Sequence, residues 1–153
     1  VQNMYKIYEK AHFCPTENNG EVLTESLEQW IERYKQLLID QDQKSLFTAT
    51  LGRLFAFSPE GLDGHEPCEA VRNMIEKYGD DRMYHSYQIE VYNRRGVYCC
   101  SAGKEELKMA DEFEKNAQYL EPNYPKTAKI FYGLSKTYES EAKRERVEAE
   151  NDW

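Results

Sequence analysis

The sequence has no long apolar run and few of the residues that cross-link small proteins. No stretch approaches the roughly 18 apolar residues that a spanning helix needs, so we predict no membrane contact. The first residues show no basic region that leads into an apolar stretch, so we expect no secretory signal. Without such a signal, 4 cysteines are more typical of free thiols than of a disulfide framework. These absences together predict a cytoplasmic protein.

Basic residues are also outnumbered by acidic ones. The chain has 20 basic and 28 acidic residues, which gives a net charge of −8. This excess opposes broad binding to phosphate backbones, so we do not expect nucleic acid as a partner. A chain of 153 residues with 40% hydrophobic and 31% charged residues is typical of one globular domain.

Motifs of common catalytic sites are missing as well. The glycine-containing stretch 58–66 lacks the Lys-Ser/Thr ending of a phosphate-binding loop. No serine or cysteine lies in a nucleophile-elbow motif. We therefore expect the protein to bind no nucleotide and no other cofactor. An enzymatic function is the alternative to a binding function.

Apolar residues recur every three or four positions along most of the chain, which predicts helices. The predicted helices cover 1–11, 24–40, 44–57, 67–78, 80–95, 104–120 and 127–150. The stretch 80–95 also alternates like a strand, but its helical neighbours favour a helix. We predict an all-α bundle of six or seven helices in a single domain, residues 1–153, with a helical bundle over 1–103 and a hairpin over 104–153.

Particular residues predict how these helices begin and pack. Ser26 followed by Gln29 matches a capping box at the start of the second helix. Glu66 as cap and Pro67 at the first helical position are predicted to start the fourth helix. Gly52 is predicted to let another helix approach the third one closely, at a propensity cost of about 1 kcal/mol.

The last fifty residues predict a helical hairpin, Lys104–Leu120 and Thr127–Glu150, joined at Glu121–Pro125. Its predicted buried faces are Leu107, Ala110, Phe113, Ala117 and Leu120 in the first helix, and Ala128, Phe131, Leu134, Tyr138 and Ala142 in the second. Charged residues crowd 139–152 and pair at helical spacing, which is typical of a solvated helix and leaves a homo-oligomer open.

This hairpin resembles a tetratricopeptide-type repeat. The matching positions are Ala110, Phe113, Ala117, Leu120 and Pro122, followed by Phe131, Leu134, Ser135 and Tyr138. The chain departs from the repeat in two ways: no 34-residue period recurs earlier, and no turn interrupts 142–150. The resemblance implies a divergent, solitary repeat-like hairpin that binds protein.

The middle of the chain also resembles an uncharacterised family of bacterial helical proteins. The resemblance lies in residues 52–56, 63–64, 69–72, 93–98 and 124–128. It implies a bacterial cytosolic setting and brings no activity with it.

Two residue sets are candidates for chemistry. His12, Cys14, His65 and Cys68 could form a tetrahedral zinc site, but neither pair has a zinc-finger spacing, so we expect no metal. His65, Glu69 and Arg72 could form a catalytic cluster with His65 as general base. A capped helix after a tight turn is the favoured explanation of the second set, with Glu69 and Arg72 simply paired.

The sequence favours a non-enzymatic adaptor or interaction module that docks a protein partner. The excess of tyrosine, 12 residues against 6 Phe and 2 Trp, supplies side chains suited to interfaces. The expected binding residues are Tyr119, Tyr124, Tyr132, Tyr138, Arg94 and Arg95. The alternatives are an enzyme or ligand-binding domain built on Asp63–Arg72 with Arg94 and Arg95, and a structural piece of a larger protein.

Overall fold

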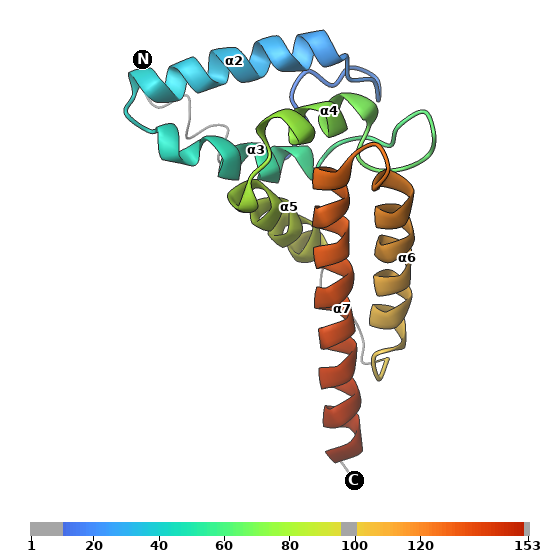
Figure 1. Ribbon diagram of the computed structural model, residues 1–153. Helices are drawn as coiled ribbons and strands as arrows, with labels where there is room; N and C mark the ends of the chain where they lie inside the picture. Colours follow the sequence, from blue (N-terminus) through green and yellow to red (C-terminus); the bar gives the residue numbers. More distant parts are fainter. Residues whose placement is uncertain (1–10, 96–100, 152–153) are drawn as a thin grey trace. The chain divides into compact units, whose positions relative to one another are not determined.

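A computed structural model describes residues 11–95 and 101–151 of the chain (Figure 1). The helices are α2 (Thr24–Asp40), the short 3-10 helix η1 (Lys44–Leu46), α3 (Phe47–Phe55), α4 (Glu69–Tyr78), α5 (Asp81–Arg94), α6 (Lys104–Leu120) and α7 (Pro125–Asn151). The described residues contain no strand beyond an isolated bridge between Asn18 and Glu21. The predicted all-α class is confirmed, including a helix where strand alternation was the competing interpretation. The helix predicted over 1–11 lies outside the described residues, apart from Ala11.

The chain divides into two compact units, residues 1–92 and 93–153. The boundary falls near the end of α5, whereas the sequence placed it between residues 103 and 104. Within the described ranges, no helix has both the length and the apolar character needed to cross a bilayer.

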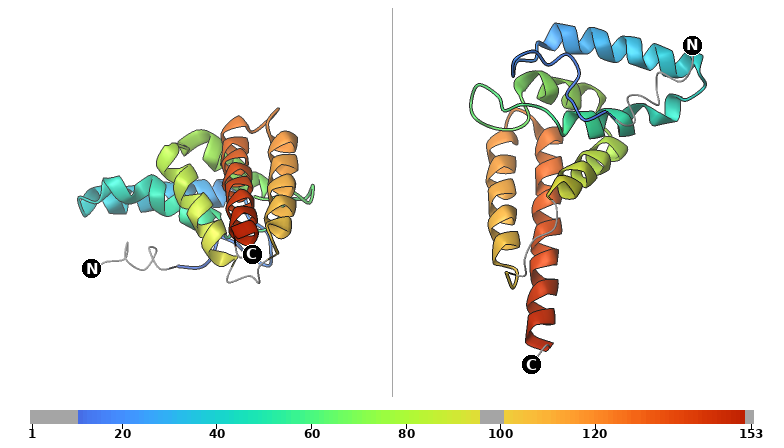
Figure 2. Two further views of the ribbon diagram at one scale, coloured as in Figure 1. Left: turned by 90° about the horizontal axis from the view of Figure 1, so that it is seen from below. Right: turned by 180° about the vertical axis from the view of Figure 1, so that it is seen from behind.

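The core of the first unit is built where α2 and α4 contact each other and where α3 packs beside them (Figures 1 and 2). Its side chains are aliphatic and aromatic and almost fully buried: Leu27, Ile31, Tyr34, Leu38, Leu51, Leu54, Phe55, Val71 and Ile75. Each such side chain stabilises the fold by about 1.5–3 kcal/mol relative to an exposed position. On α2 the buried residues Leu27, Ile31, Tyr34 and Leu38 recur every three or four positions and form one face of the helix.

A glycine controls the approach of α5 to α3. A Cβ atom at Gly52 would overlap the Met83 carbonyl oxygen and lie 3.0 Å from the Met83 carbonyl carbon. Met83 itself is fully buried. The prediction that Gly52 permits a close helix contact is confirmed, and the contact is with the backbone of α5.

The predicted bounds of α2 are confirmed, but its predicted capping residue and the predicted start of α4 are wrong. The N-cap of α2 is Leu23, which has no side-chain capping bond, so Ser26 already lies inside the first turn. The helix α4 begins at Glu69 after the N-cap Cys68, and not at Pro67. The reason is local: the Pro67 carbonyl accepts a hydrogen bond from the side chain of Arg72, while the Cys68 carbonyl accepts the first helical bond of α4 from the Arg72 N–H.

In the second unit, α6 and α7 form the predicted antiparallel hairpin (Figure 2). All five residues expected to be buried on α7 are buried, together with Thr127, Ile130 and Ser135. On α6 the prediction is wrong at Leu107, which is 55% exposed, because the buried stripe passes through Glu106 instead.

The helix α7 has 27 residues and α6 has 17. The start of α6 lies beside Ala142, because a Cβ atom at Gly103 would be 3.0 Å from the Ala142 Cα atom. The last turns of α7 therefore continue past the first residues of α6, as Figure 1 shows. Their side chains from 146 to 151 are exposed, as expected for the charged tail.

Replacing Gly52 by Ala should destabilise the protein although alanine is the better helix former. Propensity alone would add about 1 kcal/mol of stability, whereas overpacking costs about 1–3 kcal/mol. The clash here is with a backbone carbonyl and not with a flexible side chain, so we expect a cost at the upper end of that range. Urea unfolding of Gly52→Ala should therefore show a lower free energy of unfolding than the wild type. Thr48→Ala on the same helix serves as the control; equal stability of both variants and the wild type would contradict the close contact.

Candidate functional site

A buried arginine organises the loop before α4. The Arg72 residue is 1% exposed. Its Nη1 donates to Asp63 Oδ2 at 2.8 Å and its Nη2 to Asp63 Oδ1 at 2.9 Å, which is a two-point ion pair. The Nε and Nη2 atoms also donate to the carbonyls of Pro67 at 2.6 Å and His65 at 2.7 Å. The guanidinium therefore binds one carboxylate and two backbone carbonyls of the loop, using the planar fork that lysine lacks.

Further hydrogen bonds fix the same loop. The Leu62 N–H donates to Glu69 Oε1 at 3.0 Å, and the His65 N–H donates to Asp63 Oδ1 at 3.0 Å. The Gly61 N–H donates to the His65 carbonyl at 2.8 Å. We call residues 58–68, held by Arg72 and Glu69, the clamped loop.

The clamped loop accounts for three of the residues considered for catalysis. The charge of Arg72 is neutralised by Asp63, and Glu69 accepts the Leu62 N–H, so two of the three side chains hold the backbone. His65 is half-buried, and its backbone carbonyl accepts a hydrogen bond from Arg72. The catalytic use of His65, Glu69 and Arg72 stays a prediction. The expected pair between Glu69 and Arg72 is wrong, because Arg72 pairs with Asp63 and Glu69 accepts the Leu62 N–H.

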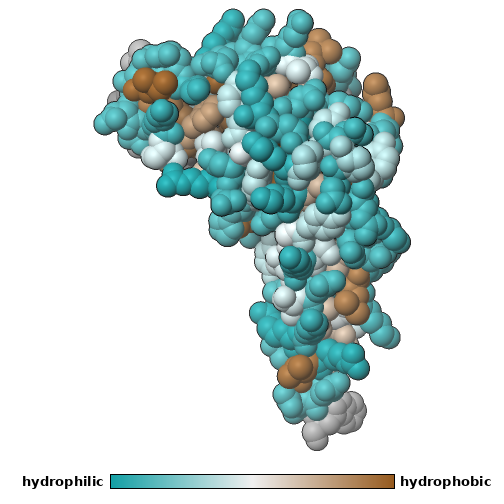
Figure 3. Space-filling model, in the orientation of Figure 1, coloured by the Kyte–Doolittle hydropathy of each residue, from teal (hydrophilic) through white to brown (hydrophobic). Residues whose placement is uncertain are grey.

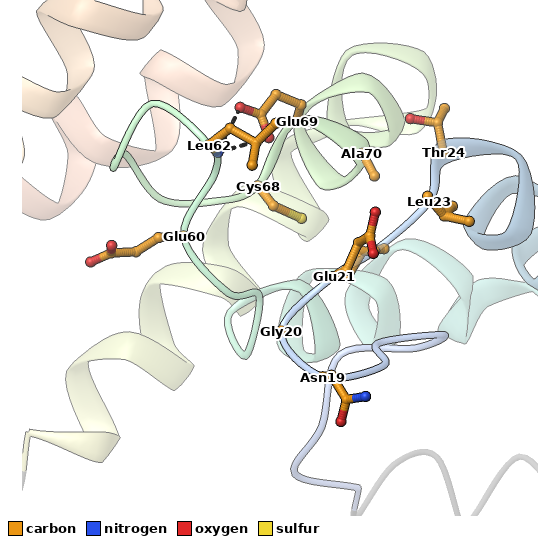
Figure 4. A pocket seen from close by; sticks show the side chains of 11 residues that line it. Asn19, Gly20, Glu21, Leu23, Thr24, Glu60, Leu62, Cys68, Glu69 and Ala70 are labelled. Carbon is orange, nitrogen blue, oxygen red and sulfur yellow. Dashed lines mark hydrogen bonds between the residues drawn. The ribbon is translucent and has the colours of Figure 1, made fainter.

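The clamped loop forms one wall of a cleft of about 630 Å³. The opposite wall is the extended segment that leads into α2, and the start of α4 lies between the two (Figure 4). The lining residues are Asn19, Gly20, Glu21, Val22, Leu23, Thr24, Glu60, Leu62, Cys68, Glu69 and Ala70. Both walls belong to the first unit.

The lining of this cleft is acidic and apolar, and it contains no basic residue. Glu21 points into the space between the two walls, whereas Glu60 points outward at its rim (Figure 4). Among the residues that the structure describes, neither carboxylate makes a hydrogen bond or an ion pair. Leu62 is fully exposed and Leu23 is 59% exposed, so apolar surface flanks the carboxylates on both walls.

The zinc alternative has no support in the described geometry. Residues 11–95 and 101–151 contain no group of three or more His, Cys, Asp or Glu side chains that could hold a metal. Cys14 and Cys68 are buried free thiols. Burial, with a smaller contribution from the neighbouring Cys68, raises the pKa of Cys14 far above its usual range, so this thiol stays protonated. The ring of His12 packs edge-on against Phe57.

A second buried ion pair lies in the second unit. Arg95 pairs with Glu106, whose side chain is 1% exposed, and Ser101 Oγ donates to the same carboxylate at 3.1 Å. The Arg95 guanidinium also lies 4.9 Å from the centre of the Tyr138 ring. Burial raises the pKa of Glu106, but bonds from Arg95, its own backbone and Ser101 outweigh burial, so the pKa is lowered overall.

These contacts change the interpretation of two predicted binding residues. Tyr138 is fully buried and packs against Phe113, so its ring belongs to the core of the hairpin and is not a surface anchor. The Arg95 guanidinium is paired with Glu106 and lies over the Tyr138 ring. The remaining predicted residues reach the surface: Arg94 and Tyr119 are exposed, and Tyr124 and Tyr132 are half-buried. The Tyr132 hydroxyl donates to Glu121 at 2.9 Å.

Sequence reasoning missed the cleft. Its walls come from 19–24 and 60–70, which are about forty residues apart and share no motif. Leu62 gave no local signal, because single apolar residues are common at protein surfaces.

Comparisons with protein-family models, with curated proteins and with solved structures give no match for this chain.

Replacing Arg72 by Lys keeps the charge but removes the fork that binds Asp63, Pro67 and His65. We expect the free energy of unfolding in urea to fall by about 2–4 kcal/mol, because the loop carbonyls and the carboxylate lose their donors. The matched control is Arg33→Lys, at an exposed position of α2, which should change the stability by less than about 0.5 kcal/mol. Equal effects of the two substitutions would contradict the clamp.

The lowered pKa of Glu106 predicts the direction in which the free energy of unfolding changes with pH. The carboxylate contributes stability above its ordinary value of 4.5, and this contribution is lost as pH falls through the lowered pKa. The free energy of unfolding of the wild type should therefore exceed that of Glu106→Gln near neutral pH, and the difference should shrink on acidification.

Chemical denaturation between pH 3 and 7, read by circular dichroism, measures this difference. The control is Glu112→Gln at an exposed position of the same helix, for which we expect a small difference at every pH. A Glu106→Gln difference that stays constant or grows on acidification would contradict a stabilising ion pair with Arg95.

Proposed function

We propose that this chain is a non-enzymatic helical interaction module that binds a protein partner, and that it does so in the bacterial cytoplasm. The observation that carries the proposal is the cleft of the first unit, where exposed leucines flank carboxylates that have no partner among the described residues. Side chains with that combination gain stabilising contacts from a partner that supplies both apolar surface and hydrogen-bond donors.

The distribution of apolar residues supports a local recognition site. On the face drawn in Figure 3, apolar residues form separate spots on a mostly hydrophilic surface. A broad hydrophobic interface of the obligate kind would need a continuous patch. A cleft with a few well-placed contacts fits a partner that docks a short segment, as in peptide recognition.

The surface tyrosines of the second unit offer a further contact region within the same proposal. Tyr119, Tyr124 and Tyr132 surround the turn between α6 and α7 and keep part of their rings accessible. Tyrosine is favoured at interfaces because it combines a large apolar ring with a polar hydroxyl. The repeat-like character of the hairpin remains part of the proposal. Tyr138 is excluded as a direct anchor, because its substitution would disturb the core.

Affinity capture from a bacterial host lysate, read by quantitative mass spectrometry, tests this proposal with variants. We expect Leu62→Ser to lose a partner that the wild type retains, at unchanged stability, because Leu62 is fully exposed. The matched control is Leu107→Ser in the second unit, which removes a leucine that is 55% exposed. Tyr119→Ala reports on the tyrosine region.

The proposal fails if no captured protein depends on Leu62 or Tyr119. Recovery of the chain itself as the dependent partner would instead identify a homo-oligomer.

A further inference from the structure

Beside Glu21, the backbone of Val22 has no hydrogen-bond partner in the part of the chain that the structure describes, whereas the backbone of Glu21 is paired with Asn18. Leu23 is extended, with φ −90° and ψ 132°, and Asn18 and Glu21 form the isolated bridge just before it. For Val22, no hydrogen bond to the N–H or C=O is present within residues 11–95 and 101–151. Val22 lines the cleft. The N–H and C=O of this one residue could receive a pair of backbone hydrogen bonds from a peptide strand.

The side chains beside Val22 determine which charge is favoured in a bound peptide. Glu21 and Leu23 are two residues apart and both line the cleft. Glu21 carries a carboxylate without a partner among the described residues, and Leu23 presents apolar surface two residues later. The cleft supplies three glutamates and no cation, and the chain as a whole has a net charge of −8.

We infer that the cleft binds an extended peptide segment of a partner protein, with a lysine or arginine placed two residues from an apolar residue. This inference rests on the proposed function and specifies the partner's chemistry. The basic side chain pairs with Glu21, and Glu60 at the rim adds long-range attraction. The apolar side chain packs between Leu23 and Leu62, while the peptide backbone pairs with Val22. Glu69 takes no direct part, because its carboxylate already accepts the Leu62 N–H.

Three synthetic heptapeptides, blocked at both ends, test each element of the inference. The first is Ala-Thr-Lys-Thr-Leu-Thr-Ala, which has the basic residue two positions before leucine. The second replaces Lys by Glu, and the third, Ala-Thr-Lys-Leu-Thr-Thr-Ala, changes only the spacing. Each is titrated into the ¹⁵N-labelled full chain, and amide chemical shifts locate and quantify binding.

We expect the first peptide to shift the amides of 19–24 and 60–70 and to bind more tightly than the other two. Glu21→Gln should weaken its binding about threefold to fivefold, as expected for loss of one partly exposed ion pair. Glu60→Gln should weaken it less, and Glu112→Gln on the second unit should leave it unchanged. Added salt should weaken binding to the wild type more than binding to Glu21→Gln.

Equal binding of the Lys and Glu peptides, shifts confined to other regions, or no binding would overturn the inference. These outcomes are separable from failure of the proposed function. If the Lys peptide fails while Leu62→Ser still loses a captured partner, the module binds protein through the cleft by other chemistry. If both experiments fail, the proposed function falls as well.

Discussion

The ion pair between Arg72 and Asp63 is the constraint on which the candidate site depends. A guanidinium removed from water is stabilising only when its charge and its donors are satisfied, and here one carboxylate and two carbonyls do so. The same contacts determine the path of the clamped loop and hence the position of Leu62 and Glu60. One wall of the cleft therefore exists because an arginine of α4 is buried beneath it.

A second arginine has a comparable role in the hairpin. Glu106 occupies a position of the buried stripe on α6 that an apolar residue would normally fill, and Arg95 compensates its charge. The ring of Tyr138 covers the guanidinium from another side. In both units, the charge of a residue inside the core is compensated by one oppositely charged side chain.

Much of the fold could be predicted from periodicity alone, because apolar residues that repeat at helical spacing leave little choice of structure. The bounds of α6 were predicted to the residue, and Gly52 was correctly identified as a contact point. The misses share a cause. Glu106 is buried where it pairs with Arg95, and the residues just before α4 accept hydrogen bonds from the Arg72 side chain. Hydrophobic spacing does not reveal such side-chain contacts. The cleft was missed for the same reason, since its walls meet only after folding.

Hydrogen exchange of individual backbone amides in the native protein tests the clamp most directly. If Arg72 and Glu69 hold the loop, the amides of Gly61, His65 and Cys68 should exchange far more slowly than in an unstructured peptide, with protection that is lost together with that of α4. Exchange of these three amides at the rate of an unstructured peptide, beside a protected α4, would contradict the clamp and the cleft built on it.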